Sequence, residues 1–252
     1  MTKRSRNTLE GSLRPRVRKK TADAASRTHL LPSDAVMESI EKEVKGRVAR
    51  RDRLGEMART LRRSSQEFMR HLHEERGRTP GRSLLGSKKS RSHQGRNILP
   101  QQQELREMAQ RLIRELEREG WREEGVVEAA LQEWVEASLL WAIVEGHPFP
   151  TPSELGVHAE AYLLGLADVV GELRRLTITA LGRAEVDTAK ALLEDMDDLA
   201  GMLMRFDFPR SVLSMKPKQD MARSLVERTR GDVEVARFMN KFVSQRSKRS
   251  KG

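Results

Sequence analysis

An uninterrupted helical pattern of about forty residues constrains the fold of this chain more than any other feature. Between Ser33 and Glu75, apolar residues recur mostly three, four or seven positions apart, as they do along one face of an α-helix. These residues are Met37, Ile40, Val44, Val48, Leu54, Met57, Leu61, Phe68 and Leu72. Ser33 directly follows Pro32 and is a suitable N-cap. A helix of this length would measure about 60 Å, far more than a typical globular helix, so the pattern predicts a long helical bundle.

The rest of the chain also has mainly helical periodicity. Further helices are predicted at about 105–120, 124–145, 159–181, 184–206 and 218–243. The segment GHPFPTP ends the 124–145 helix because its three prolines cannot continue a helix, and Ser153, just beyond them, is a plausible helix cap. No run of alternating β-branched residues and no hairpin turn signal is found. We therefore predict an all-α fold, an elongated bundle of about seven helices with long antiparallel members.

Positive charge is concentrated in three segments of the chain. Of the formal net charge of +11, residues 1–32 hold an excess of 7, residues 76–100 an excess of 7 and residues 241–252 an excess of 5. The remainder is therefore net acidic. These segments are poor in apolar residues, as is typical of disordered regions that contact polyanions. We predict a basic arm at 1–32, a helical domain at 33–243 with a basic insertion at 76–100, and a basic tail at 244–252, with nucleic acid as the leading partner.

Several classes of protein are disfavoured by composition. The chain has no cysteine, which excludes disulfides, thiolate metal sites and cysteine nucleophiles. Its most apolar run, VVEAALQEWVEASLLWAIV, is interrupted by Glu128, Glu133 and Glu136, and the N-terminus lacks the apolar segment of a signal peptide. We therefore expect no membrane association and a cytoplasmic location.

Two pairs of acids lie in apolar segments. Glu133 and Glu136, in LQEWVEA, are three residues apart, and Asp168 and Glu172, in GLADVVGELRRL, are four apart. Each pair projects from one side of its helix. A carboxylate at the edge of a core is costly unless it is paired or binds a cation. In helical bundles, inward-facing carboxylates of neighbouring helices commonly hold metals, and small residues such as Gly165 and Gly171 would let the two backbones approach.

Oxygen ligands without His or Cys favour hard cations, Mg²⁺ or Mn²⁺. In a basic protein, carboxylate-held Mg²⁺ indicates phosphodiester chemistry, in which the ion activates water and stabilises charge on the leaving oxygen. The alternative is structural, because such pairs arise readily on amphipathic helices and Arg174 or Arg175 could neutralise Glu172. His71 and His73, two apart on a helix, make a poor zinc pair and are expected at the surface or facing RNA.

Four segments resemble the translin and translin-associated factor X (Trax) family. AYLLGLADVVGELRRLTITAL resembles the signature helix of the family, and LQEWVEA resembles its LQEYVEA segment, with Trp134 in place of Tyr. RDRLGEMARTLRRSSQEFMRHLHE is similar to the first long helix of the family and SLVERTRGDVEVARF to its last. The resemblance covers about residues 45–240 and leaves the basic arm and tail outside it.

This resemblance implies an all-α bundle of the seven-helix type that forms hollow, commonly octameric homo-oligomers and binds RNA or single-stranded DNA inside. Trax-type members are Mg²⁺-dependent endoribonucleases, whereas translin-type members bind nucleic acid without the full acidic set. The discriminating acids of the family fall on Glu133, Glu136, Asp168 and Glu172, all of them present here. The resemblance thus favours the catalytic branch, a Mg²⁺-dependent endoribonuclease of single-stranded RNA, over a non-catalytic binding shell. Candidates for guiding the RNA backbone are Arg59, Arg62, Arg63 and Arg70.

Overall fold

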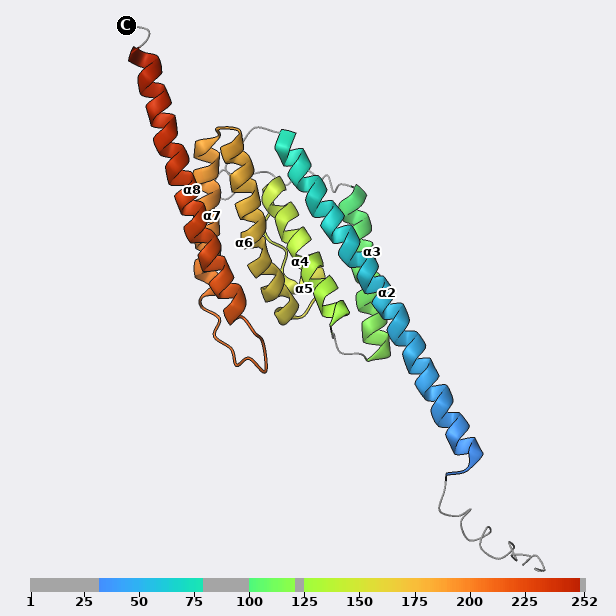
Figure 1. Ribbon diagram of the computed structural model, residues 1–252. Helices are drawn as coiled ribbons and strands as arrows, with labels where there is room; N and C mark the ends of the chain where they lie inside the picture. The colour runs from blue at the N-terminus through green and yellow to red at the C-terminus, as the bar shows by residue number, and fades with distance from the viewer. Residues whose placement is uncertain (1–31, 79–99, 121–124, 250–252) are drawn as a thin grey trace, which may run out of the picture. The chain divides into compact units, whose positions relative to one another are not determined.

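The computed structural model describes residues 32–78, 100–120 and 125–249 of the 252-residue chain. Within these ranges it contains helices and no strand, so the predicted all-α class is confirmed (Figure 1). The helices are α2 (Asp34–Arg78), α3 (Pro100–Glu119), α4 (Val126–Glu145), α5 (Pro152–Leu155), α6 (Ala159–Gly182), α7 (Val186–Leu203) and α8 (Lys216–Arg249). The predicted basic arm and most of the predicted 76–100 insertion lie outside the described residues.

The long N-terminal helix exists, and most other helices begin and end within a few residues of their predicted limits. Two limits differ more. α3 begins at Pro100, five residues before the predicted start, because proline is well tolerated in the first turn of a helix. α8 continues to Arg249, through most of the segment predicted as a tail, since its Ser, Gln, Lys and Arg residues include no helix-breaking proline or glycine.

The chain forms two units, residues 1–50 and 51–252. The described part of the first unit is the beginning of α2, where apolar residues follow the predicted helical spacing but are about half exposed. They are Val36, Met37, Ile40, Val44 and Val48. The second unit contains the hydrophobic core, to which α2 contributes from Leu54 onward.

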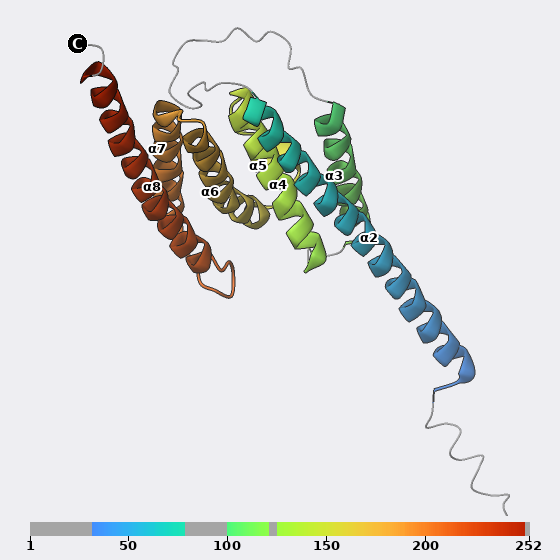
Figure 2. The ribbon, with the colours of Figure 1, turned by 45° about the horizontal axis from the view of Figure 1, so that its top comes forward.

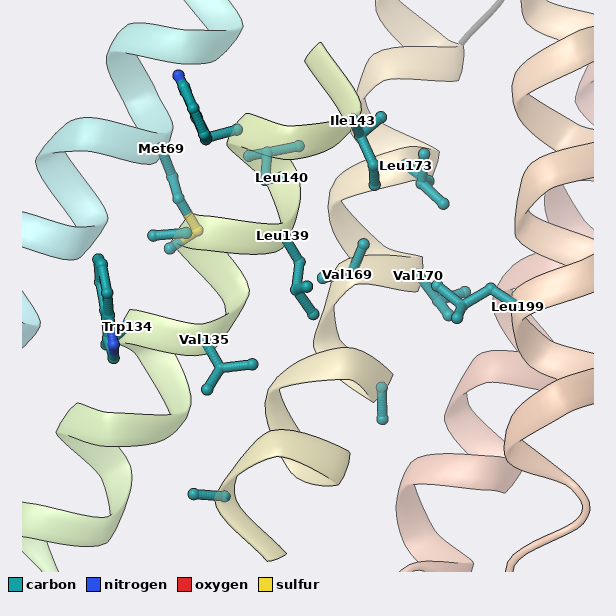
Figure 3. Packing of buried hydrophobic residues seen from close by; sticks show 14 of the residues in the cluster. Met69, Trp134, Val135, Leu139, Leu140, Ile143, Val169, Val170, Leu173 and Leu199 are labelled. Carbon is teal, nitrogen blue, oxygen red and sulfur yellow. The ribbon is translucent and has the colours of Figure 1, made fainter. Parts of the chain in front are cut away.

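Helix α6 lies at the centre of the second unit and contacts α4, α7 and α8, while α3 contacts α4. Both ribbon views show α6 between α4 and α7 (Figures 1 and 2). Close up, Val135 and Leu139 extend from α4 toward α6, and Val170 meets Leu199 between α6 and α7 (Figure 3). All four are largely or fully buried. The central position of α6 therefore comes from apolar residues on more than one of its sides.

The connection from α4 to α6 turns through two left-handed glycines. Gly146 ends α4 with φ 70° and Gly156 ends α5 with φ 71°, a conformation that glycine adopts without steric cost. The cap of α5 is Thr151, which forms a capping box with Glu154, whereas Ser153, the expected cap, lies inside this helix.

Among the described helices, none is both long and apolar enough to cross a lipid bilayer.

Candidate carboxylate site

The four predicted acids lie on two helices that pack against each other, α4 and α6. Glu133 and Glu136 come from α4, and Asp168 and Glu172 come from α6. Each acid is partly buried beside fully buried apolar residues of its own helix, so the acids line the edge of the core. The side chains of Glu133, Asp168 and Glu172 are 18%, 27% and 19% exposed, respectively.

Close contact between α4 and α6 depends on one of the two glycines singled out in the sequence. A Cβ atom on Gly165 would lie 2.7 Å from the carbonyl oxygen of Gln132 and 2.7 Å from the Cβ of Val135. No side chain fits there, which confirms the prediction for Gly165. The prediction for Gly171 is wrong, because a Cβ at that position would meet only Leu225 of α8, at an ordinary 3.9 Å.

Two of the acids accept hydrogen bonds from other helices. Arg62 Nε donates to Glu133 Oε1 at 3.2 Å, and Gln66 Nε2 donates to the same oxygen at 3.0 Å. Asp168 receives a donor on each oxygen, Lys218 Nζ on Oδ1 and Gln132 Nε2 on Oδ2. Helices α2, α4 and α8 thus all contribute a side chain that neutralises or fixes an acid.

The third paired acid is Glu172, whose partner is a histidine. His73 Nε2 forms a hydrogen bond with Glu172 Oε2, and the His73 side chain is only 7% exposed. The expectation that His73 lies at the surface is therefore wrong, because α2 turns this side chain inward onto α6. Arg175 approaches Glu172 at 4.0 Å, whereas Arg174 pairs with Asp232 at 3.0 Å instead.

Glu136 differs from the other three acids because it takes part in none of the ion pairs among the described residues. Burial, followed by the charges of Asp168, Glu172 and Glu133, raises the pKa of Glu136 to about 8, although the charge of Lys218 acts to lower it. This carboxyl is therefore protonated at neutral pH. Its sensitivity to all three acids shows that the four groups form one electrostatic cluster, which we call the carboxylate cluster.

A divalent cation fits the chemistry of this cluster. Four carboxyl groups offer the oxygen ligands that Mg²⁺ and Mn²⁺ prefer, and a bound cation would offset the repulsion that disfavours ionisation of Glu136. In the conformation described, no three Asp, Glu or His side chains of the described residues converge into a metal site. Three of the acids, Glu133, Asp168 and Glu172, are instead held by nitrogen donors of neighbouring side chains.

The arginines predicted to guide RNA have different surroundings. Arg59 is paired with Glu56 of the same helix at 2.9 Å, and Arg62 is engaged with the carboxylate cluster. Arg63 and Arg70 are exposed. Of the four, Arg62 is thus the one that the fold brings to the acids.

Sequence reasoning missed four residues of the site, Gln66, His73, Gln132 and Lys218. Gln132 lies within the LQEWVEA segment directly before Glu133, and this position in the sequence could have indicated that it belongs to the site. His73 and Lys218 are 99 and 50 residues from the acids that they contact, and no spacing rule connects such distant positions.

A cavity of about 720 Å³ lies elsewhere, lined by residues of α3 to α6 and of the segment before α8, and it includes none of the four acids. The four acids are only partly buried and lie outside this cavity, at the edge of the bundle core.

Comparison with known proteins shows the family to which the chain belongs. The model of the translin family matches residues 49–230. The chain belongs to the translin family. Among its relatives is an uncharacterized protein of Methanocaldococcus jannaschii, 37% identical over 110 residues, which are 43% of this chain and 50% of that protein. The match thus spans about half the length of that relative.

Solved structures of translin-type proteins share the fold. The crystal structure of apo-NeC3PO superposes with a TM-score of 0.65 at 18% identity, covering 82% of this chain and 98% of that one. AfC3PO, solved alone and as a complex with duplex RNA, gives a TM-score of 0.59 at 27% identity, covering 81% of this chain and 97% of that one. The part of the chain outside the matched family region includes the predicted basic arm.

Proposed function

We propose that this translin-family chain is a Mg²⁺-dependent endoribonuclease that cleaves single-stranded RNA, with Glu133, Glu136, Asp168 and Glu172 as its metal-binding and catalytic residues. The observation that carries the proposal is the grouping of these acids on α4 and α6, where three charges act on one buried carboxyl. Strongly perturbed pKa values of this kind cluster at functional sites.

RNA is supported as the substrate class by two observations. One structural relative, AfC3PO, has been solved with duplex RNA. The three basic segments of the chain supply the positive charge that a nucleic-acid phosphate backbone attracts. Because that relative was solved with duplex RNA, duplex and single-stranded substrates both belong in the test.

A homo-oligomeric shell is part of the proposal, and α8 supports it. Val235, Phe238, Met239 and Phe242 repeat at helical spacing, and each is about 60% exposed. An exposed apolar stripe of this kind is typical of a surface that meets another subunit.

Each group of the site has a distinct part in the proposed reaction. When bound by the four acids, Mg²⁺ supplies activation of water and stabilisation of the charge that develops on the phosphate. Glu136 is the acid best suited to accept or hold a proton, since its pKa lies near 8 in the absence of metal. Arg62, 48% exposed beside Glu133, is placed to attract an RNA phosphate toward the cluster.

One observation favours a second candidate function, a non-catalytic binding protein of RNA or single-stranded DNA. Glu133, Asp168 and Glu172 already have nitrogen donors from Arg62, Lys218 and His73. In that case the acids would serve to join α2, α4, α6 and α8.

Cleavage of labelled RNA by the purified full-length protein distinguishes the two functions. Wild type is compared with Glu133→Gln and Asp168→Asn, which retain side-chain shape, in Mg²⁺ and in EDTA, on single-stranded and duplex substrates. Glu145→Gln in α4 and Glu160→Gln in α6 are matched controls, because both residues are exposed.

The nuclease predicts Mg²⁺-dependent cutting that is lost in the two cluster variants and retained in the two controls. Oligomer mass and RNA affinity of each variant are measured in parallel, so that lost cutting is not mistaken for lost assembly. RNA binding without cutting in Mg²⁺ or Mn²⁺, unchanged by any of the substitutions, would refute the nuclease and leave the binding protein.

A further inference from the structure

Lys218 is the one lysine that contacts the carboxylate cluster among the described residues. It lies in the first turn of α8, and its Nζ donates a hydrogen bond to Asp168 Oδ1. Gln132 Nε2 donates to the other oxygen of the same carboxylate. Both oxygens of Asp168 are therefore engaged, and the lysine ammonium stands where a cation bound to Oδ1 would have to stand.

The charge of Lys218 acts on more than its direct partner. It lowers the pKa of Glu136, whose other neighbours Asp168, Glu172 and Glu133 all raise it. One ammonium thus offsets part of the repulsion in the cluster as a whole. Arg62 contacts Glu133 and His73 contacts Glu172. Lys218 contacts Asp168, the acid of α6 that neither of these two residues contacts.

The residue type and its exposure suit a reversible contact. A lysine ammonium is a compact charge on a flexible four-carbon stem, whereas arginine would hold a carboxylate with a rigid two-pronged geometry. The side chain of Lys218 is 31% exposed, so it has a path to solvent. A lysine buried on all sides would have no such path.

We propose that Lys218 is the internal counter-cation of the carboxylate cluster, held on Asp168 in the metal-free chain and displaced from it when a divalent cation binds. The displacement follows from electrostatics, because an ammonium and a divalent ion cannot share one carboxylate oxygen without strong repulsion. Lys218 is a positioning residue in this scheme, since it keeps the acids in place until the ion arrives. The inference rests on the proposed metal site.

Binding of Mn²⁺ to the full-length protein without RNA tests the displacement directly. Mn²⁺ is followed by electron paramagnetic resonance and by calorimetry in wild type, Lys218→Met and Lys216→Met. Lys216 is the matched control because it lies two residues away and pairs with Asp220 at 3.2 Å on the exposed surface. Removal of a competing cation should make Mn²⁺ bind about tenfold tighter to Lys218→Met, with no change in the control.

A double-mutant cycle in EDTA tests the metal-free half of the inference. Thermal unfolding is measured for wild type, Lys218→Met, Asp168→Asn and the double variant, with circular dichroism to check that each folds. Lys218→Met should lower the melting temperature when Asp168 is present and have little effect once Asp168 is Asn. Mn²⁺ should then raise the melting temperature of Lys218→Met more than that of wild type.

The outcomes separate failure of this inference from failure of the proposed function. If Mn²⁺ binds to wild type, is lost with Asp168→Asn and binds no tighter to Lys218→Met, the metal site stands and the role of Lys218 is refuted. The role of Lys218 is also refuted if, in EDTA, the melting-temperature changes of Lys218→Met and Asp168→Asn simply add in the double variant, because the two residues would then not be coupled. If no protein binds Mn²⁺ and the cycle still shows coupling, the metal site itself is refuted, and the displacement with it.

Discussion

Gly165 of α6 faces the carbonyl oxygen of Gln132 on α4 so closely that a Cβ atom would lie 2.7 Å from it. This contact sets the separation of the two helices that carry the acids. The same Gln132 donates its side-chain amide to Asp168, three residues beyond Gly165. The close approach of the α4 and α6 backbones and the position of the Asp168 carboxylate thus both depend on contacts of Gln132.

Gly165→Ala should therefore destabilise the protein, whereas Gly171→Ala should not. The first substitution forces α4 and α6 apart against backbone atoms, at a cost of about 1–3 kcal/mol or more. The second adds only an ordinary van der Waals contact with Leu225 and replaces glycine in a helix interior, which should stabilise by up to about 1 kcal/mol. Chemical denaturation of both variants checks this pair, and equal effects of the two substitutions would contradict the packing described.

Asp195 of α7 predicts a pH dependence of stability that is separate from the carboxylate cluster. Its side chain is buried, and its Oδ2 has no hydrogen-bond partner in the structure. Burial, followed by the charges of Asp198 and Glu194, raises the pKa of Asp195 to about 7. The folded chain thus holds a proton that the unfolded chain releases near pH 4, so stability falls as the pH rises from about 4 to 7.

Asp195→Asn removes the cost of the buried charge. The variant should gain stability over wild type at pH 8, by at most ~4 kcal/mol, and the gain should shrink toward pH 4. Melting temperatures at a series of pH values measure this difference. The control Asp197→Asn removes only an exposed ion pair with Arg230, so it should cause a small change that varies little between about pH 5 and 8. A pH-independent gain in Asp195→Asn would contradict the assignment.

The apolar stripe at the end of α8 predicts a subunit contact. The rings of Phe238 and Phe242 lie 5.3 Å apart, and both are 61% exposed. Replacing both with serine should lower the mass of the assembly, measured by light scattering after size exclusion, and leave the helix content unchanged. Asn240→Ser, on an exposed polar position of the same turn, is the control. An unchanged mass in the double variant would show that subunits do not meet through this stripe.

Exposed arginines on α2 predict the salt dependence of RNA binding. Arg63 and Arg70 are exposed, whereas Arg59 is held by Glu56. Loss of each phosphate contact should reduce the slope of log affinity against log salt by about 0.7 for single-stranded RNA. Affinities of Arg63→Ala and Arg70→Ala over a range of salt concentrations measure this slope. If the slopes of Arg63→Ala and Arg70→Ala equal those of wild type and Arg59→Ala, these two arginines do not contact RNA phosphates.

Periodicity and motif spacing predicted the helices and the four acids because both depend on neighbours along the chain. Asp168 and Glu172 share a side of α6 for the same reason that Leu61 and Phe68 are both buried, since helical geometry relates nearby positions. The contacts of His73 and Lys218 could not be predicted, because they depend on how α2 and α8 pack against α6. Periodicity also marked Ile40 and Val44 as apolar, but it cannot tell whether a stripe is buried within its own chain.

The pairing of Lys218 with Asp168 has an evolutionary consequence. A related protein that lost Asp168 would keep the Lys218 ammonium beside the core without its carboxylate partner. One that lost Lys218 would keep the Asp168 carboxylate next to the other acids without its ammonium partner. Each change therefore creates pressure for the other. Related proteins that abandon the acidic cluster should have exchanged both residues together, and the lysine position alone should mark which lineages still maintain the site.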